Sequence, residues 1–363
     1  MRHSDNFCRN FLVVTFYLIS LLIANDIKAC TIFSLIDSNT NVVGKSNAWG
    51  LKQGYLIVNN RNIKKVGFVI GKDNLIKWTS QYGSVTFNQI SQEMPNGGIN
   101  EKGLVVEILS SSAKYPEKDK RKAINESQWI QFQLDNYENV DQVIASETIL
   151  RIHRAASNMH YFICDRFGNR ATIDFKNGLF KVYKNKELII PVLTNTPYEF
   201  LVRPDTSIGA KRSLNESKLR FNIAKELITK RQELGQGFNE AFAWEIINKC
   251  KQDINNYNVV YNLKEMTISF NDPINNDIKI IDIRSINFDC SSNTKSISFT
   301  FSKPGKVNEF FDTYTSDLND KQIDIVYKQL SNEGRIVGIK RMMIKIFFIK
   351  KLKRIVKNLK CES

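Results

Sequence analysis

Strand-rich and helix-rich segments alternate in blocks along this 363-residue chain, and their order restricts the folds open to it. Residues 30–109 form a series of short segments rich in β-branched and aromatic residues, separated by Asn, Asp, Ser and Gly. Such segments are typical of β-strands. We expect two helices next, one that starts at Asn125 and one capped by Asp141, and then a second group of strands.

A second pair of helices is expected at about residues 218–232 and 239–251. A third group of strands and a last helix at about residues 319–330 follow, and the sequence PNGG at residues 95–98 predicts a turn. This order predicts an α+β fold in which two antiparallel sheets pack together with helices outside. A hydrophobic fraction of 42% suits one packed domain, which we place at residues 30–334.

Residues 1–29 have the pattern of a signal peptide, a basic start followed by an apolar run at residues 11–24 that is short for a membrane span. Ala29 suits the position before a cleavage site, so we predict export to the periplasm or the exterior. Two alternatives stay open, and both attach the protein to a membrane. One is an uncleaved anchor, because Ile27 is larger than the usual small residue. The other is a lipoprotein signal, because residues 27–30 loosely resemble a lipobox.

Cleavage after Ala29 would make Cys30 the first residue of the mature protein. A thiol nucleophile and a free α-amine would then lie a few bonds apart. The unperturbed pKa of an α-amine is about 7.7–8.0, so this amine can take the thiol proton near neutral pH without a histidine. The sequence therefore allows the chemistry of an N-terminal nucleophile hydrolase.

The remaining cysteines beyond the leader are spread along the chain, at Cys164, Cys250, Cys290 and Cys361. They form no CxxC pair, so neither a zinc site nor a redox motif is indicated, and we expect no metal and no cofactor. One disulfide is compatible with export, but the sequence leaves its partners open. A cysteine–histidine pair would have to use His153 or His160, and both are better explained as structural histidines within strands.

The formal net charge of +15 is concentrated in the C-terminal tail, residues 335–363, where ten Lys and Arg residues stand against Glu362 alone. Apolar residues interleave with these charges at near-helical spacing. Nucleic acid is a poor partner for an exported chain. Two readings of this basic amphipathic tail stay open: contact with an anionic membrane surface, or a terminal helix packed on its own domain.

Five short sequences occur in order behind the leader. They are CTIF from Cys30, GKSNAW from Gly44, YGSVTFN with GINEKGL at residues 82–104, LTNTPY from Leu193, and SKLRF from Ser217. Together they resemble the choloylglycine hydrolase family, the cysteine N-terminal nucleophile amidases that include bile salt hydrolases and penicillin V acylases. The resemblance implies the four-layer αββα sandwich of that family.

The resemblance also implies roles for three residues. Cys30 matches the nucleophile, which forms a thioester acyl-enzyme that water cleaves. Asn195 matches a residue whose side-chain amide faces the developing oxyanion, a donor worth about 2.7–4 kcal/mol. Arg220 matches an arginine that holds the surroundings of the nucleophile in place. From the sequence alone, Asn195 would be a turn residue and Arg220 a solvated charge on a helix.

Four further positions bear on activity. Lys45 stands where many relatives have Arg, and it keeps a positive charge that favours the thiolate. Ser110 falls where relatives have Asn or Tyr, which weakens its expected contribution to the oxyanion hole. Ala48 replaces an Asp that in relatives orients the α-amine. Asn47, the neighbouring residue, could substitute as the acceptor.

The leading hypothesis is an exported amidohydrolase that cleaves a linear N-acyl amide of the bile-salt, penicillin V or acyl-homoserine-lactone type. The alternative is a catalytically impaired member that acts as a binding or surface protein, because Ala48 removes the orienting carboxylate. A lipoprotein anchored at Cys30 is a third reading, since acylation of the α-amine removes the base. The partner we expect is a small acyl amide, and by analogy with relatives the chain forms a homo-oligomer.

Overall fold

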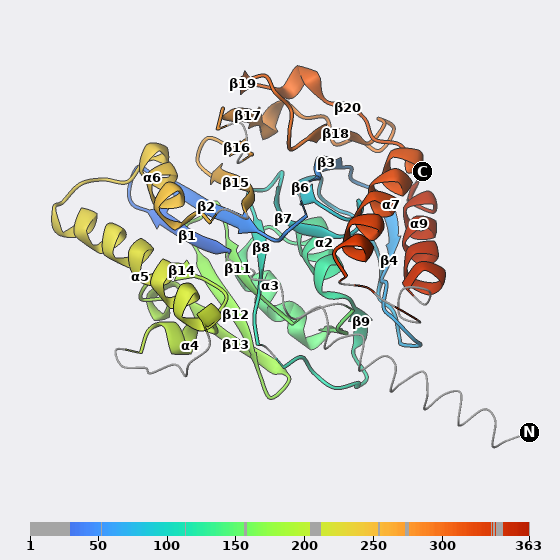
Figure 1. The fold of residues 1–363 in the computed structure, drawn as a ribbon, viewed down its shortest axis with the longest axis horizontal. Helices are drawn as coiled ribbons and strands as arrows, with labels where there is room; N and C mark the ends of the chain where they lie inside the picture. Colours follow the sequence, from blue (N-terminus) through green and yellow to red (C-terminus); the bar gives the residue numbers. More distant parts are fainter. Residues whose placement is uncertain are drawn as a thin grey trace, which may run out of the picture.

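The computed structural model describes residues 30–362, except for residues 52, 113, 156–157, 204–211, 253–254, 273–275, 335, 337 and 339–343. The predicted signal peptide, residues 1–29, lies outside the described residues. The chain folds from Cys30 onward into two large sheets, two small sheets and several helices (Figure 1).

The first large sheet has the strand order β14-β1-β2-β15-β16-β17-β19. Its strands are β14 (Val192–Leu193), β1 (Thr31–Ile36), β2 (Asn41–Ala48), β15 (Asn255–Asn262), β16 (Thr267–Asn271), β17 (Lys279–Asp282) and β19 (Gly305–Lys306). All neighbours are antiparallel except β17 and β19. The N-terminal strand β1 therefore lies beside β14, which comes from the middle of the chain.

The second large sheet has the order β13-β12-β11-β8-β7-β6-β3-β18-β20. Its strands are β13 (Leu179–Lys184), β12 (Arg170–Lys176), β11 (Met159–Cys164), β8 (Val105–Ser110), β7 (Pro95–Asn100), β6 (Ser84–Asn88), β3 (Tyr55–Asn59), β18 (Lys295–Ser298) and β20 (Asp312–Thr313). The small sheets join β9 (Lys122–Ile124) to β10 (Leu150–Ile152), and β21 (Lys360–Cys361) to β4 (Ile63–Val66) and β5 (Lys77–Thr79).

Helices cover the outer face of each large sheet. On the first sheet lie α5 (Arg212–Glu233) and α6 (Glu240–Cys250), beside β1 and β2 in Figure 1. On the second lies α2 (Glu126–Asn136), followed by α3 (Val140–Ala145). The other helices are α4 (Tyr198–Leu201), α7 (Ser316–Asn332), α9 (Lys350–Lys357), a π-helix at Ile344–Ile349, and short 3₁₀ turns at Ser146–Thr148, Asn185–Glu187, Ile283–Ser285 and Asn308–Phe310.

Aromatic side chains fill the space between the two large sheets. The Phe87 ring of β6 stacks on Tyr257 of β15, with 4.6 Å between centroids, and meets Phe270 of β16 edge-on at 6.1 Å. A second core joins α2 to the outer face of the second sheet, where Trp129 packs on Tyr161. The order helix, sheet, sheet, helix confirms the predicted α+β fold with a four-layer αββα sandwich.

Two local predictions are wrong. Residues 95–98 form part of β7 instead of a turn, with Gly97 opposite Phe87. The glycines are needed for close approach: a Cβ on Gly97 would lie 1.9 Å from Glu107 Oε2, and one on Gly98 would lie 2.4 Å from the Val85 carbonyl oxygen. The cap of α3 is Asn139, whose side chain accepts a hydrogen bond from the Gln142 amide, rather than Asp141.

The C-terminal tail packs on its own domain. In α9, Leu352 is buried in a small core with Met94 and Ile323, so the apolar side of the helix faces the protein. The helix also lies beside α7, where Lys353 pairs with Asp324 at 2.7 Å. No helix among the described residues is long and apolar enough to cross a bilayer. Contact between the remaining basic face and a membrane stays a prediction.

A disulfide between Cys290 and Cys361 links the end of the tail covalently to the domain, across a sequence separation of 71 residues. Because it restricts the unfolded chain, we expect the double variant Cys290→Ser/Cys361→Ser to lose about 2–4 kcal/mol of unfolding free energy. Denaturant titration measures this loss. Dithiothreitol should lower the midpoint of the unaltered protein to that of the double variant and leave the double variant unchanged. Equal midpoints for oxidised and reduced protein would contradict the prediction.

Candidate active site

Cys30 lies at the start of β1, at the edge of the inter-sheet core. Thr31 pairs with Ser46 in the antiparallel register, which places Cys30 beside the end of β2. The Cys30 thiol lies 3.7 Å from Asn47 Oδ1 and 3.7 Å from the Ala48 carbonyl oxygen. Cys30 is 5% exposed, so its sulfur is surrounded by protein groups that fix its orientation.

Asn195 and Arg220 reach Cys30 from two other elements. Ile32 pairs with Leu193 of β14, so the chain just beyond β14 passes the first residues of β1. Arg220 of α5 then donates to Asn195 Oδ1 at 3.0 Å, to the Cys30 carbonyl at 3.5 Å and to Thr31 Oγ1 at 3.3 Å. The three residues that the sequence singled out for catalysis therefore lie together.

The Arg220 contact fixes which way the Asn195 amide points. A guanidinium can only donate, so the atom that it contacts must be the amide oxygen. The amide nitrogen of Asn195 is thereby turned to the other side, where it donates to the Ser110 carbonyl at 3.1 Å. Among the described residues this nitrogen has one acceptor, so the second of its two hydrogens remains for a further one. Arg220 itself is 2% exposed, which excludes the reading of this residue as a solvated charge.

The charge of Arg220 is held in a largely apolar setting. Burial lowers the pKa of its guanidinium, and the neighbouring Cys30 and Cys250 sulfurs oppose this shift.

The Ser217 hydroxyl, one turn earlier on α5, lies 2.9 Å from the hydroxyls of both Thr194 and Thr196. These contacts attach the segment around Asn195 to α5, so the arginine and the amide move as one unit.

Lys45 has a partner that sequence reasoning did not find. Its ammonium is fully buried and pairs with Glu107 Oε2 of β8 at 2.5 Å. The same ammonium donates to the carbonyl of Asn96, and Tyr261 donates to the other Glu107 oxygen. Burial raises the pKa of Glu107, while Lys45 opposes the shift. The Lys45 charge is thus balanced by Glu107, and its predicted support of the thiolate stays a prediction.

A lone carboxylate in the apolar strand segment LVVEIL was the available signal for Glu107. Its strand neighbours at i−2 and i+2, Val105 and Leu109, belong to the core between the sheets. Alternation along a strand therefore places Glu107 on the same buried face, where a charge needs a partner.

Asn47 is oriented by a small amide network. Its Nδ2 donates to Gln89 Oε1 at 3.4 Å, and Asn96 donates to the same oxygen. Gln89 Nε2 in turn donates to the Leu51 carbonyl, so each amide in the network has a defined direction. Asn47 Oδ1 is left facing the Cys30 thiol. Ala48 is fully buried and offers only its carbonyl oxygen to the same sulfur.

The other candidate residues, Ser110, the two histidines and two further cysteines, make contacts that suit structural roles. Ser110 contacts Asn195 through its main-chain carbonyl. His153 lies 2.9 Å from Asp73, and His160 is buried 2.7 Å from Asp174. Burial raises the pKa of the Cys164 thiol to about 12 and that of Cys250 to about 11. These two thiols are therefore protonated at neutral pH and poor nucleophiles.

Known proteins share sequence and fold with this chain. The sequence model of the linear amide C–N hydrolases, choloylglycine hydrolase family, matches residues 30–209. Over this part, just under half of the chain, the sequence matches that family. The penicillin V acylase of Pectobacterium atrosepticum is 27% identical over 139 residues, which are 34% of this chain and 36% of that protein. The sequence match therefore spans about a third of this relative.

Two solved structures share the fold. The penicillin V acylase of Agrobacterium tumefaciens has a TM-score of 0.63 at 18% identity, over 79% of this chain and 98% of that one. The R18L variant of the conjugated bile acid hydrolase of Clostridium perfringens has a TM-score of 0.60 at 20% identity, over 77% and 99%. The N-terminal nucleophile hydrolase fold thus extends well beyond the sequence match.

The buried pair Lys45–Glu107 makes a stability prediction. Removing one partner leaves an uncompensated buried charge, so Lys45→Met and Glu107→Gln should each cost about 3–5 kcal/mol of unfolding free energy. The double variant should cost clearly less than the sum of the two. Denaturant unfolding of all four proteins measures this coupling. As a control, Lys184→Met removes the exposed partner of Asp141 and should change stability by about 0–1 kcal/mol. Additive losses at positions 45 and 107 would contradict the pairing.

Proposed function

We propose that the chain is an exported amidohydrolase that cleaves a linear N-acyl amide with Cys30 as an N-terminal nucleophile. The observation that carries this proposal is the Arg220 bridge, which brings Cys30 and Asn195 together and turns the Asn195 amide nitrogen into the donor. The match to a family of linear amide C–N hydrolases supports it. The mature start at Cys30 is part of the proposal.

The reaction begins with the α-amine of Cys30 taking the thiol proton. The thiolate then attacks the amide carbonyl carbon, and the electron pair of the C=O bond moves to oxygen. The free hydrogen of Asn195 Nδ2 is available to this oxyanion. Collapse of the intermediate breaks the C–N bond, and the leaving amine takes the proton from the α-ammonium. A thioester between the acyl group and Cys30 remains.

Water completes the cycle. The α-amine takes a proton from the attacking water, whose oxygen bonds to the thioester carbonyl carbon. The C–S bond then breaks, the acid leaves, and the sulfur regains its proton. Asn195 Nδ2 donates a hydrogen bond to the second oxyanion as it does to the first. In this scheme Arg220 is a positioning residue, because it acts through Asn195 and through the backbone of Cys30.

The substrate class is also a proposal. Relatives are named for penicillin V and for conjugated bile acids, which both carry an apolar acyl group on an amide. An acyl homoserine lactone is a third substrate of this kind. A homo-oligomer and contact between the basic tail and a membrane surface are proposals as well.

A second candidate function is binding without turnover. Ala48 favours it, because alanine has no acceptor for the α-amine. Two acceptors lie next to the thiol, Asn47 Oδ1 and the Ala48 carbonyl oxygen, and both are neutral, so they orient an ammonium more weakly than a carboxylate does. Retention of the leader or lipidation of Cys30 would lead to the same outcome, because either removes the free amine.

The nucleophile is tested with substitutions of Cys30 and Asn195. With penicillin V or glycocholate as substrate, Cys30→Ala should abolish turnover, and Asn195→Ala should lower kcat by about 10²–10³-fold because an oxyanion donor is lost. Release of the amine product measures both. Cys164→Ala is the matched control for removing a buried thiol and should keep the activity. Full turnover by Cys30→Ser on every amide cleaved would rule out the mechanism.

The role of Asn47 as the acceptor for the α-amine is tested with substitutions at Asn47 and Ala48. Asn47→Ala should lower kcat/KM by about 10²-fold, because the acceptor beside Cys30 is removed. Adding Ala48→Asp to that variant should restore activity, while Ala48→Asn should restore less because it supplies no charge. If Ala48→Asp alone creates turnover that the unaltered protein lacks, the chain is the impaired member and the binding function stands.

A further inference from the structure

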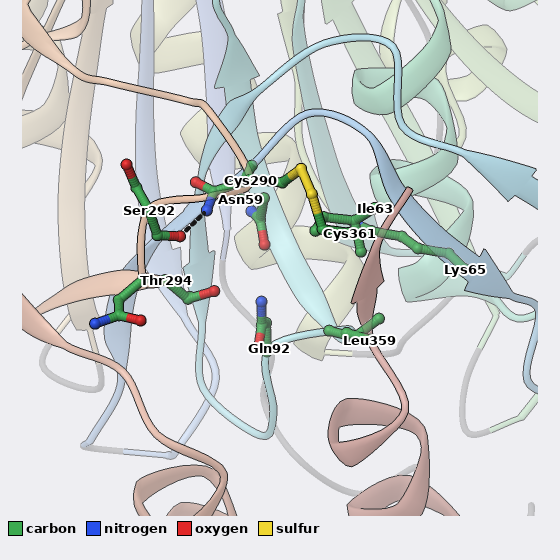
Figure 2. A pocket seen from close by; sticks show the side chains of 11 residues that line it. Asn59, Ile63, Lys65, Gln92, Cys290, Ser292, Thr294, Leu359 and Cys361 are labelled. Carbon is green, nitrogen blue, oxygen red and sulfur yellow. Dashed lines mark hydrogen bonds between the residues drawn. A yellow bond between two sulfur atoms is a disulfide. The ribbon is translucent and has the colours of Figure 1, made fainter. Parts of the chain in front are cut away.

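A pocket lies on the domain, and among the described residues its lining shares none with the candidate active site. It has a volume of about 220 Å³, and the disulfide between Cys290 and Cys361 forms part of its wall (Figure 2). The other lining residues come from the end of β3, from β4, from the loop after β6, from residues 292–294 and from the tail at Leu359. At about 30 Å³ per water molecule, this space equals roughly seven waters.

Asn59 presents an unsatisfied oxygen to this pocket. It is 1% exposed, and its Oδ1 has no hydrogen-bond partner among the described residues. Figure 2 shows its side chain and that of Gln92 directed toward one another across the pocket. A buried carbonyl oxygen without a donor is costly, so a group that donates to it from the pocket would be favoured.

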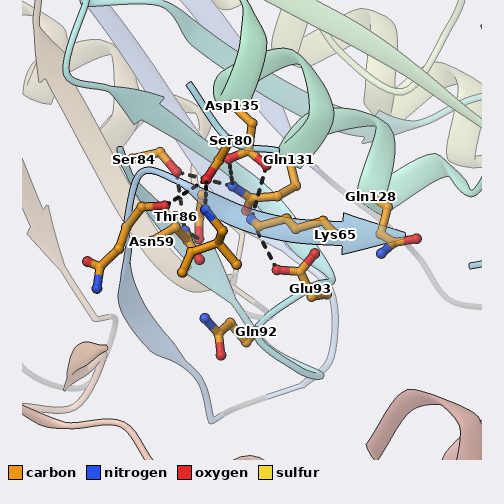
Figure 3. Close-up of polar contacts among 12 residues, drawn as sticks. Asn59, Lys65, Ser80, Ser84, Thr86, Gln92, Glu93, Gln128, Gln131 and Asp135 are labelled. Atoms are coloured by element: carbon orange, nitrogen blue, oxygen red, sulfur yellow. Dashed lines mark hydrogen bonds and ion pairs between the residues drawn. The ribbon is translucent and has the colours of Figure 1, made fainter. Parts of the chain in front are cut away.

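The orientation of the Asn59 amide is fixed by its neighbours. Its Nδ2 donates to Thr86 Oγ1 at 2.9 Å (Figure 3), and the Thr86 hydroxyl donates in turn to Asn88 Oδ1. Asn88 Nδ2 donates to the carbonyls of Ser91 and Gln92, which can only accept, so its oxygen must face Thr86. Exchanging the oxygen and nitrogen of Asn59 would put an acceptor where Thr86 needs a donor. The oxygen therefore stays on the pocket side.

Asn60 repeats this pattern at the neighbouring wall. Its Nδ2 donates to the Ser292 carbonyl at 2.8 Å, which fixes the direction of the amide. Asn60 Oδ1 has no partner among the described residues, and the residue is 4% exposed. Two neighbouring lining residues therefore each carry a buried, unsatisfied acceptor.

The one charged residue that lines the pocket is already paired. Lys65 Nζ lies 3.0 Å from Asp135 and 3.2 Å from Glu93, and all three side chains are buried (Figure 3). The two carboxylates raise the pKa of Lys65 against the opposing effect of burial. The ammonium is thus held by the protein, and the remaining polar lining groups are the neutral amides and hydroxyls of Asn59, Asn60, Gln92, Ser292, Asn293 and Thr294.

We propose that this pocket binds a small neutral polyhydroxylated molecule, from glycerol to a monosaccharide in size. A hydroxyl both donates and accepts, so one group can donate to Asn59 Oδ1 while it or its neighbour accepts from the Gln92 amide. The C–H faces of such a molecule suit Ile63 and Leu359, the apolar residues of the wall. The site is separate from the hydrolase chemistry and does not depend on it.

The test is ligand-observed NMR on the oxidised protein with glycerol, erythritol and glucose as probes. Methylammonium and acetate, which are small and charged, serve as class controls. We expect at least one polyol to bind saturably. Leu359→Trp, which fills the pocket, should weaken that binding at least ten-fold. Leu234→Trp, on a 60%-exposed leucine outside the pocket, should leave it unchanged.

Gln92→Ala is the second variant, in case the larger tryptophan disturbs the tail. It removes one donor from the wall and should also weaken polyol binding about ten-fold, with the melting temperature as a check on folding. Loss of binding in both pocket variants and its retention in Leu234→Trp would support the site. Three results would each overturn it: no saturable polyol binding, equal binding by pocket-filled and unaltered protein, or saturable binding of methylammonium or acetate instead of the polyols.

Discussion

The candidate active site depends on one buried guanidinium. Arg220 extends from α5 and reaches the Cys30 carbonyl just before β1, the side chain of Thr31 at the start of β1, and the Asn195 amide that follows β14. Because a guanidinium offers several donors in a fixed plane, a single side chain sets both the backbone of Cys30 and the direction of Asn195. Its burial cost is met by hydrogen bonds to two other segments, which the fold must first bring together with α5. The site is therefore a consequence of the sheet order rather than of any local motif.

The sheet order also explains how a polar site is held next to an apolar core. The Lys45–Glu107 pair links β2 of the first sheet to β8 of the second, in the layer that Phe87 and Tyr257 otherwise fill with aromatic rings. Gly97 leaves the space that the Glu107 carboxylate occupies. A buried pair of this kind adds little stability, but it requires one register between the two sheets. Within the first sheet, the pairing of Thr31 with Ser46 places the end of β2, and with it Asn47, at the side of Cys30.

The sequence was informative where the signal is local. The β-branched strand segments, the helix pairs and the helix start at Asn125 could all be predicted, because each depends on residues that are close in sequence. The meeting of Cys30, Asn195 and Arg220 was predictable only through a family resemblance, since residues 30 and 220 are 190 positions apart. The Glu107 partner of Lys45, the Gln89 network and the Cys290–Cys361 disulfide were missed. Each rests on contacts between strands or loops distant in sequence, which local patterns do not encode. Residues 95–98 were predicted as a turn instead of a strand. In a sequence, glycines that allow close packing look the same as glycines that form a turn.

We propose that Cys30 works as the first residue of the mature chain, with its own α-amine as the base. The most direct test is the intact mass of the protein recovered from an exporting host that expresses the full sequence. We expect a mass that begins at unmodified Cys30 and increases by one acyl group when a slow amide substrate is added. A mass that retains residues 1–29, or that carries lipid on Cys30, would contradict it, because the proposed base would then not exist.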